Sequence, residues 1–119
     1  MRITNDSIRD ALIRALADEY SRKILLGTIS RARSVEELSQ SENIPISTAY
    51  RRVSEMREVG LLTVEKTILT PEGKKFEMFR SSFKGIHIDL NQGEIAIDME
   101  LNEDVAMRLS RLWATMRGS

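Results

Sequence analysis

One short stretch of the chain concentrates side chains that can contact phosphates and the edges of nucleic-acid bases. Ser47 and Thr48 supply hydroxyls, Tyr50 supplies a phenol, and Arg51 and Arg52 supply guanidinium groups. Donors of these kinds bind phosphate oxygens, and a guanidinium can pair with a guanine in the major groove. An ordinary helix with a solvated basic face is the alternative interpretation. Tyr50 could reach a phosphate or a thymine methyl group, or it could pack half-buried beside a neighbouring helix.

These side chains belong to the second of two helices predicted over residues 34–62. Ser34 precedes three residues that include two glutamates, which is typical of a capped helix start. Pro45 disfavours helix for the residue before it, and we expect the second helix over residues 47–59. Gly60 is placed to end that helix in the left-handed conformation. Three apolar residues of this helix recur as one buried stripe: Ala49, Val53 and Met56.

The run S-T-A-Y-R-R-V-S-E-M-R-E-V-G-L-L, residues 47–62, resembles the recognition helix of a winged helix-turn-helix DNA-binding protein. It is similar to the ArsR-like transcription regulators, and most of all to their archaeal branch with an I-P-x-S-T-x-Y-R pattern. The resemblance implies that residues 47–59 lie in the major groove of double-stranded DNA. ArsR relatives that sense metals use thiolates or histidine clusters. This chain has no cysteine and one histidine, so the resemblance does not carry metal sensing over to it.

The composition, with 41% hydrophobic and 30% charged residues, is ordinary for a soluble protein, and 119 residues fit one domain or one domain with an appendage. No apolar run reaches the roughly 18 residues of a membrane span, and the first ten residues lack the apolar segment of a secretory signal. We therefore expect a cytoplasmic protein without membrane contact. The net charge is zero, but residues 1–85 carry a balance of +3 and residues 86–119 a balance of −3. The basic excess thus accompanies the stretch that could meet DNA.

No set of residues in the sequence is typical of catalysis or of metal binding. His87 is expected on the polar face of a strand, and strand alternation or helix capping explains the acidic pairs at 98/100 and 103/104. Neither a glycine-rich phosphate loop nor a nucleophile elbow is present. We predict that the protein is not an enzyme and has no metal site and no cofactor.

After the second helix, the sequence predicts a short β-hairpin, the wing. Its strands would be residues 61–64 and 67–70, with Glu65 and Lys66 at the tip. Lys66 is a candidate phosphate contact, although Glu65 beside it weakens this interpretation.

A helix is predicted next, over residues 71–82, because Thr70 and the proline after it are typical of a helix start. Three aromatic residues would form its packed face: Phe76, Phe79 and Phe83. Lys74 and Lys75, like Arg57 near the end of the preceding helix, are expected to face solvent.

Residues 86–101 alternate between apolar and polar side chains, which predicts two strands around residues 91–93. A three-residue loop would mix the two faces, whereas a turn at Gln92-Gly93 keeps the apolar faces together. We therefore predict three apolar cross-strand pairs: Leu90 with Ile95, Ile88 with Ile97, and Ile86 with Met99. The apolar face of this hairpin needs a cover, and the last helix is the obvious candidate.

Asn102 is expected to cap that last helix, which carries a broad apolar stripe: Val105, Leu109, Leu112, Trp113 and Met116. The stripe either closes the domain or meets a second copy of the protein. We favour dimerisation, because DNA-binding helices usually work in symmetric pairs. A small molecule held between the hairpin and this helix would add ligand sensing, but the sequence names no effector.

The predicted fold class is α+β, mainly α. A winged helix-turn-helix domain over residues 1–84, opening with helices at 6–17 and about 18–29, is followed by a β-hairpin and a helix for dimerisation over residues 85–119. The predicted function is sequence-specific binding of double-stranded DNA by a homodimeric transcription regulator. Its predicted DNA contacts are Ser47, Thr48, Tyr50, Arg51, Arg52 and Lys66. The alternative is a winged-helix module that binds another protein and no DNA, which the zero net charge and the short wing keep open.

Overall fold

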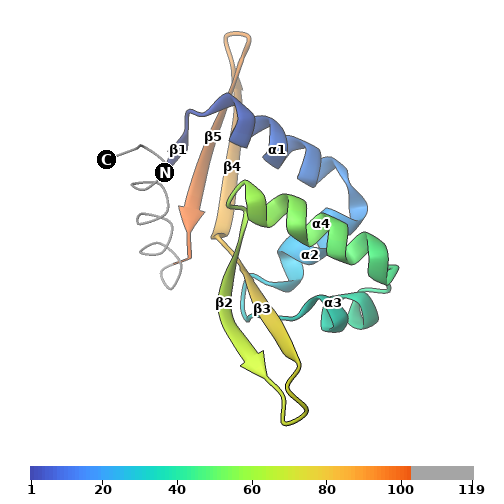
Figure 1. Ribbon diagram of the computed structural model, residues 1–119. Helices are drawn as coiled ribbons and strands as arrows, with labels where there is room; N and C mark the ends of the chain where they lie inside the picture. Colours follow the sequence, from blue (N-terminus) through green and yellow to red (C-terminus); the bar gives the residue numbers. More distant parts are fainter. Residues whose placement is uncertain (103–119) are drawn as a thin grey trace.

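The computed structural model describes residues 1–102, in which a bundle of four helices lies beside two β-hairpins (Figure 1). The helices are α1 (Asp6–Ala17), α2 (Glu19–Gly27), α3 (Val35–Ser41) and α4 (Ile46–Glu58). The strands are β1 (Arg2–Ile3), β2 (Leu62–Leu69), β3 (Lys75–Ser81), β4 (Phe83–Asn91) and β5 (Glu94–Leu101). None of the helices in this part of the chain combines the length and the apolar character needed to cross a membrane.

The predicted last helix lies outside the described residues. The same holds for its five dimerisation candidates: Val105, Leu109, Leu112, Trp113 and Met116.

The helices begin and end at residues whose side chains or conformation satisfy free backbone groups. Asn5 and Asp18 cap α1 and α2, each accepting a hydrogen bond from a backbone N–H three residues on. Ser34 and Glu37 form the predicted capping box of α3. At the end of α4, Gly60 has a φ of 84°, and the N–H of the next residue donates to a carbonyl five residues back. The predicted termination of this helix is thereby confirmed.

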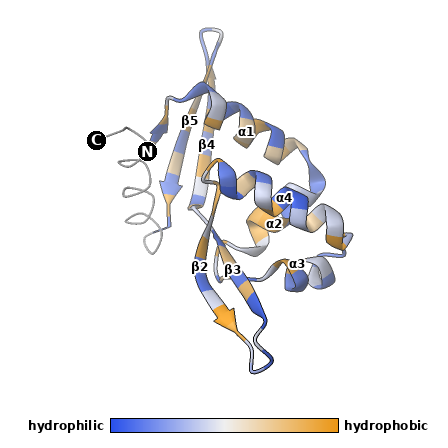
Figure 2. Cartoon of the chain, viewed as in Figure 1, coloured by the Kyte–Doolittle hydropathy of each residue, from blue (hydrophilic) through white to orange (hydrophobic). Residues whose placement is uncertain are grey.

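The apolar faces of the helices and of the second hairpin meet in one hydrophobic core (Figure 2). Leu12 of α1, Leu38 of α3 and Val53 of α4 are buried there together with Ile97 and Met99 of β5. The sequence predicts that the last helix covers the apolar face of this hairpin. The half of the hairpin nearest the helices, which carries Ile97 and Met99, packs against the shared core instead. It is therefore integral to the packing of the helix-turn-helix part.

The wing is longer than the sequence indicated, and the helix predicted over residues 71–82 is wrong. β2 pairs antiparallel with β3 from Leu62 opposite Ser81 to Leu69 opposite Lys75, so most of the supposed helix is the second strand of the wing. Of the three aromatic residues assigned to it, Phe79 is buried in β3 and Phe83 is buried at the start of β4.

At the wing tip, residues 70–74, the chain forms a turn in place of the predicted helix start. The hydroxyl of Thr70 accepts a hydrogen bond from the N–H of Lys74 at 3.0 Å, and the N–H of Gly73 donates to the carbonyl of Thr70 at 2.9 Å. Gly73 has a φ of 84°. Threonine and proline followed by glycine here make a tight turn, in which proline favours the second position. Lys66 consequently lies within β2 and not at the tip.

The register predicted for the second hairpin is confirmed. Leu90 pairs with Ile95, Ile88 with Ile97, and Ile86 with Met99. Gln92 and Gly93 both have positive φ, as a two-residue type I′ turn requires. The strand β1, which the sequence did not predict, adds to the free edge of β5 and gives the strand order β1-β5-β4. The fold is α+β, a winged helix-turn-helix with an added β-hairpin.

A single residue, Ser82, separates the wing from the second hairpin, and the two point to opposite ends of the molecule (Figure 1). This joint is buried and polar. The hydroxyl of Ser81 lies 2.8 Å from that of Thr28 and donates to the carbonyl of Leu25 at 2.6 Å, while Asn102 donates to the carbonyl of Ser81 at 2.7 Å. The joint thus ties both hairpins to α2.

Candidate nucleic-acid interface

Helix α4 turns one side to the core and the opposite side to solvent. The predicted stripe of Ala49, Val53 and Met56 is buried, as expected. Ser47, Arg51 and Ser54 recur at i, i+4 and i+7 on the opposite side, and all three are exposed. No side chain caps the N-terminus of the helix, where Pro45 and the two residues after it are also exposed. The free N–H groups at the start of α4 and the hydroxyl of Ser47 therefore lie on the same exposed side as the guanidinium of Arg51.

Arg51 is the more accessible of the two neighbouring arginines in α4. Its side chain is 62% exposed, and its contact with the carboxylate of Glu55 is long, at 3.9 Å. A pair this exposed is worth little, because water and salt screen it. The guanidinium of Arg51 is thus available to a ligand at small cost.

Arg52 has a different environment from Arg51. Its Nε lies 3.0 Å from Oδ2 of Asp18 and its Nη2 lies 3.3 Å from Oδ1, and only 25% of the side chain is exposed. The same carboxylate accepts hydrogen bonds from the N–H and hydroxyl of Ser21 at the start of α2. Burial acts to raise the pKa of Asp18, but these hydrogen bonds and the charge of Arg52 outweigh it and lower the pKa. Arg52 therefore holds α4 against α2.

Tyr50 lies on the side of α4 that faces α3. Nearly half of its surface is exposed, and its hydroxyl donates a hydrogen bond to the carboxylate of Glu36. That hydrogen bond, with smaller contributions from burial and the charge of Glu36, raises the pKa of Tyr50 above its ordinary value. The phenol is thus kept protonated as a donor. Thr48, on the opposite side of the helix, is half-buried.

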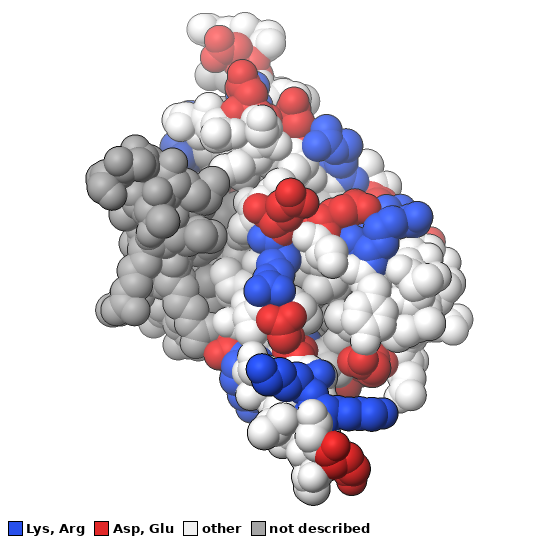
Figure 3. Space-filling view, in the orientation of Figure 1, with Lys and Arg blue, Asp and Glu red and all other residues white. Residues whose placement is uncertain are grey.

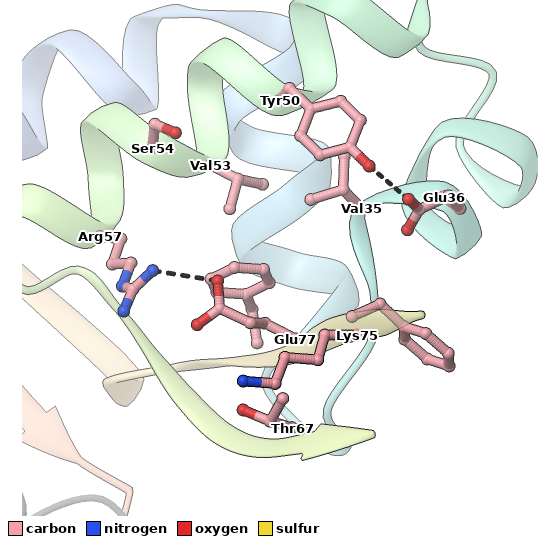
Figure 4. Close-up of a pocket in the computed structure, with 11 residues that line it drawn as sticks. Val35, Glu36, Tyr50, Val53, Ser54, Arg57, Thr67, Lys75 and Glu77 are labelled. Atoms are coloured by element: carbon pink, nitrogen blue, oxygen red, sulfur yellow. Dashed lines mark hydrogen bonds and ion pairs between the residues drawn. The ribbon is translucent and has the colours of Figure 1, made fainter. Parts of the chain in front are cut away.

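A groove of about 430 Å³ separates helices α3 and α4 from the wing (Figure 4). Arg57 reaches across it from α4, with Nη1 3.1 Å from Oε1 of Glu77 on β3. Lys75 and Thr67 extend into it from the wing. The expectation that Arg57 and Lys75 only face solvent is therefore incomplete, because both line one groove.

The sequence did not indicate this groove, because the helix predicted over residues 71–82 placed Lys75 outside the wing. Arg57 could have been found, because it lies seven residues after Tyr50 and so on the same side of α4.

Lys66 points away from this groove. Successive residues of a strand face opposite sides, and Thr67 lines the groove. Over α4 and the wing, Lys and Arg alternate with Asp and Glu instead of forming a continuous basic track (Figure 3). Within residues 1–102, no group of three or more histidine or acidic side chains is placed to hold a metal ion.

An exposed second helix, a preceding helix with a capping box and an adjacent wing together define the winged helix-turn-helix class. Comparisons with known proteins agree on the central motif: residues 16–65 match the family model of a helix-turn-helix domain. No curated protein matches the chain. Among solved structures, HlyU from Vibrio cholerae N16961 is similar, with 19% sequence identity and a TM-score of 0.44 over 93% of this chain and 97% of that chain.

Proposed function

We propose that the protein is a transcription regulator that binds specific sequences of double-stranded DNA with α4 in the major groove. The observation that carries this proposal is the outward side of α4, where Ser47, Arg51 and Ser54 are exposed beside a helix N-terminus without a side-chain cap. The match to a helix-turn-helix family model includes this whole helix. The recognition helix of such motifs presents its N-terminal part to base edges.

The predicted contact residues have unequal roles in this proposal. Arg51 is the residue to pair with a guanine, a contact worth about 1–3 kcal/mol of discrimination. Ser47 and the N–H groups near it hold a phosphate, and Thr48 and Tyr50 flank this contact. Arg52 reaches DNA only if it leaves Asp18, so its main contribution is to orient α4. Lys66 adds a phosphate contact from the outer face of the wing.

The proposed regulator works as a homodimer in which residues 1–84 bind DNA and residues 85–119 pair two copies. Within the described residues, the outer half of the second hairpin supports this proposal. Ile88, Leu90 and Ile95 share its apolar face and are 42%, 76% and 40% exposed. Neighbouring apolar side chains exposed on one face are suited to contact with another molecule. The predicted apolar stripe of the last helix would extend it.

A winged-helix module that binds a protein partner remains the second candidate. The alternation of acidic and basic side chains over α4 and the wing favours it, because a strong DNA-binding surface is usually more basic (Figure 3). DNA binding that weakens steeply with salt would exclude this candidate.

Selection of bound sequences from a random DNA pool, followed by affinity measurements on the selected duplex, tests the proposal. Arg51→Ala should weaken binding to the selected duplex by about tenfold or more and relax the preference at one base pair. Arg31→Ala is a matched control, since Arg31 is 64% exposed and also lies 3.9 Å from a carboxylate. Equal losses in the two variants would contradict the assignment of Arg51 to base recognition. A pool that yields no enriched sequence would contradict the proposed function itself.

A further inference from the structure

The groove between α4 and the wing contains two cations from facing walls. Arg57 extends from the last turn of α4, and Lys75 extends from the start of β3 on the opposite side (Figure 4). Thr67 lies beside Lys75 on the same wall, and Ser54 also lines the groove. Cations that line one groove from separate elements suit the recognition of a phosphate group.

Two carboxylates line the same groove. Glu36 accepts a hydrogen bond from Tyr50, and Glu77 pairs with Arg57. Glu77 of β3 accepts the guanidinium of Arg57 at 3.1 Å, and the two side chains are 38% and 50% exposed. A guanidinium binds a carboxylate and a phosphate through the same pair of parallel donors. Through its hydrogen bond to Nη1 and its negative charge, Glu77 therefore competes with a backbone phosphate for Arg57.

We propose that this groove is a further contact with the DNA backbone and that Glu77 is its internal competitor, from which Arg57 must be released before it can bind a phosphate. The proposal rests on the proposed DNA binding by α4. It adds to that function a residue of the wing that lowers affinity for DNA. Glu77 and the phosphate compete for one guanidinium, so the binding of a phosphate by Arg57 costs one internal ion pair.

The release of Arg57 is feasible because the ion pair is solvated. Both partners keep a large exposed fraction, so neither charge is left buried when the pair separates. We expect the groove to keep its shape without the pair, since Val53 and Phe79, which also line it, are buried in the core. Glu77 therefore regulates affinity without holding the fold together.

The test measures the affinity of four full-length proteins for a mixed-sequence duplex: the wild type, Glu77→Gln, Arg57→Gln, and the double variant. A mixed sequence suffices because a phosphate contact carries no sequence information. Glu77→Gln should bind roughly threefold to fivefold more tightly than the wild type. The slope of log affinity against log salt concentration should steepen by about 0.9, the value for one additional phosphate contact.

The double variant separates release of Arg57 from a simple loss of negative charge. If Glu77 acts by holding Arg57, then Glu77→Gln should increase affinity much less in the Arg57→Gln background than in the wild type. Equal increases in both backgrounds would overturn the proposal. Thermal unfolding of each variant should change little, which would show that affinity differences do not arise from loss of the fold.

A charge-matched control distinguishes this site from the rest of the wing. Glu72→Gln removes the same charge from the exposed tip, away from the groove residues. Its salt slope should equal that of the wild type, and a slope that steepens as much as in Glu77→Gln would overturn the proposal. If the wild type binds no duplex at low salt, the proposed DNA binding itself fails. That result is distinct from binding without any coupling between Arg57 and Glu77.

Discussion

Asp18 connects α2 to α4 through one carboxylate. It caps α2 through the backbone of Ser21, binds the hydroxyl of that serine, and pairs with Arg52 of α4. Arg51 and Arg52 are adjacent and look equivalent in the sequence, but Arg51 is exposed whereas Arg52 is paired with Asp18. Sequence reasoning could not separate Arg51 from Arg52, because the distinction depends on a partner 34 residues away.

The pH dependence of stability should report on Asp18. A carboxylate whose pKa is lowered in the folded state stabilises that state above the ordinary value of 3.8, and this contribution is lost as the pH falls through the lowered value. Asp18→Asn should therefore cost about 1 kcal/mol of unfolding free energy near pH 7, and the difference from the wild type should shrink in acid. Urea unfolding at a series of pH values measures this. Asp10→Asn, on the exposed side of α1, removes the same charge and should have little effect.

Among the helices and strands, the sequence correctly predicted the features that depend on neighbouring residues. It failed where pairing between distant strands determines the structure. The capping box of α3, the glycine that ends α4 and the register of the second hairpin each depend on residues a few positions apart, and all are confirmed. Threonine and proline at 70–71 suit a helix start and a turn equally well. The choice is made by pairing of β3 with β2 and by the backbone bridge between Arg33 and Phe79.

The strand β1 was missed for a related reason. Two residues carry no detectable alternation, and Arg2 and Ile3 become a strand only because β5 offers an unpaired edge.

Substitution of Gly73 distinguishes the observed wing tip from the rejected helix. The position has a φ of 84°, and a Cβ atom built there would meet no atom within 4 Å. The cost of Gly73→Ala is then purely conformational, about 1 kcal/mol of lost stability, and Gly73→Asn should cost less because asparagine tolerates this conformation better. In a helix, the alanine substitution would instead stabilise the protein by up to about 1 kcal/mol. Chemical denaturation of the wild type, Gly73→Ala and Gly73→Asn shows whether the alanine lowers or raises the free energy of unfolding.

In the whole molecule, the two halves of the second hairpin have different surroundings. Its inner half is part of the core, with Ile97 and Met99 buried, whereas its outer half carries an apolar surface into solvent. The wing projects from the other end of the molecule (Figure 1). The wing and the apolar outer half of the second hairpin thus lie at opposite ends of the molecule (Figure 1).

Self-association of the protein should depend on the apolar outer half of the second hairpin and on the predicted last helix. Exposed apolar residues elsewhere should not contribute. Leu90→Glu, at the exposed end of the hairpin, should shift sedimentation towards the monomer, as should Leu109→Glu combined with Trp113→Glu in the predicted last helix. Leu69→Glu near the wing tip is the matched control, because Leu69 is also largely exposed. An unaltered assembly in all variants would exclude pairing through residues 85–119.

The buried joint at Ser82 has a mechanical consequence for such a dimer. Its N–H donates to the carbonyl of Leu61 at 3.0 Å and its hydroxyl donates to that of Gly60 at 2.5 Å, so the joint resists torsion. Two copies that pair through their hairpins would hold their recognition helices at one separation and one angle. One base pair inserted between the half-sites rotates one of them by about a tenth of a turn around the duplex. A dimer with this stiff joint would bind that operator weakly. It would therefore discriminate between operators by the spacing of their half-sites as well as by their sequence.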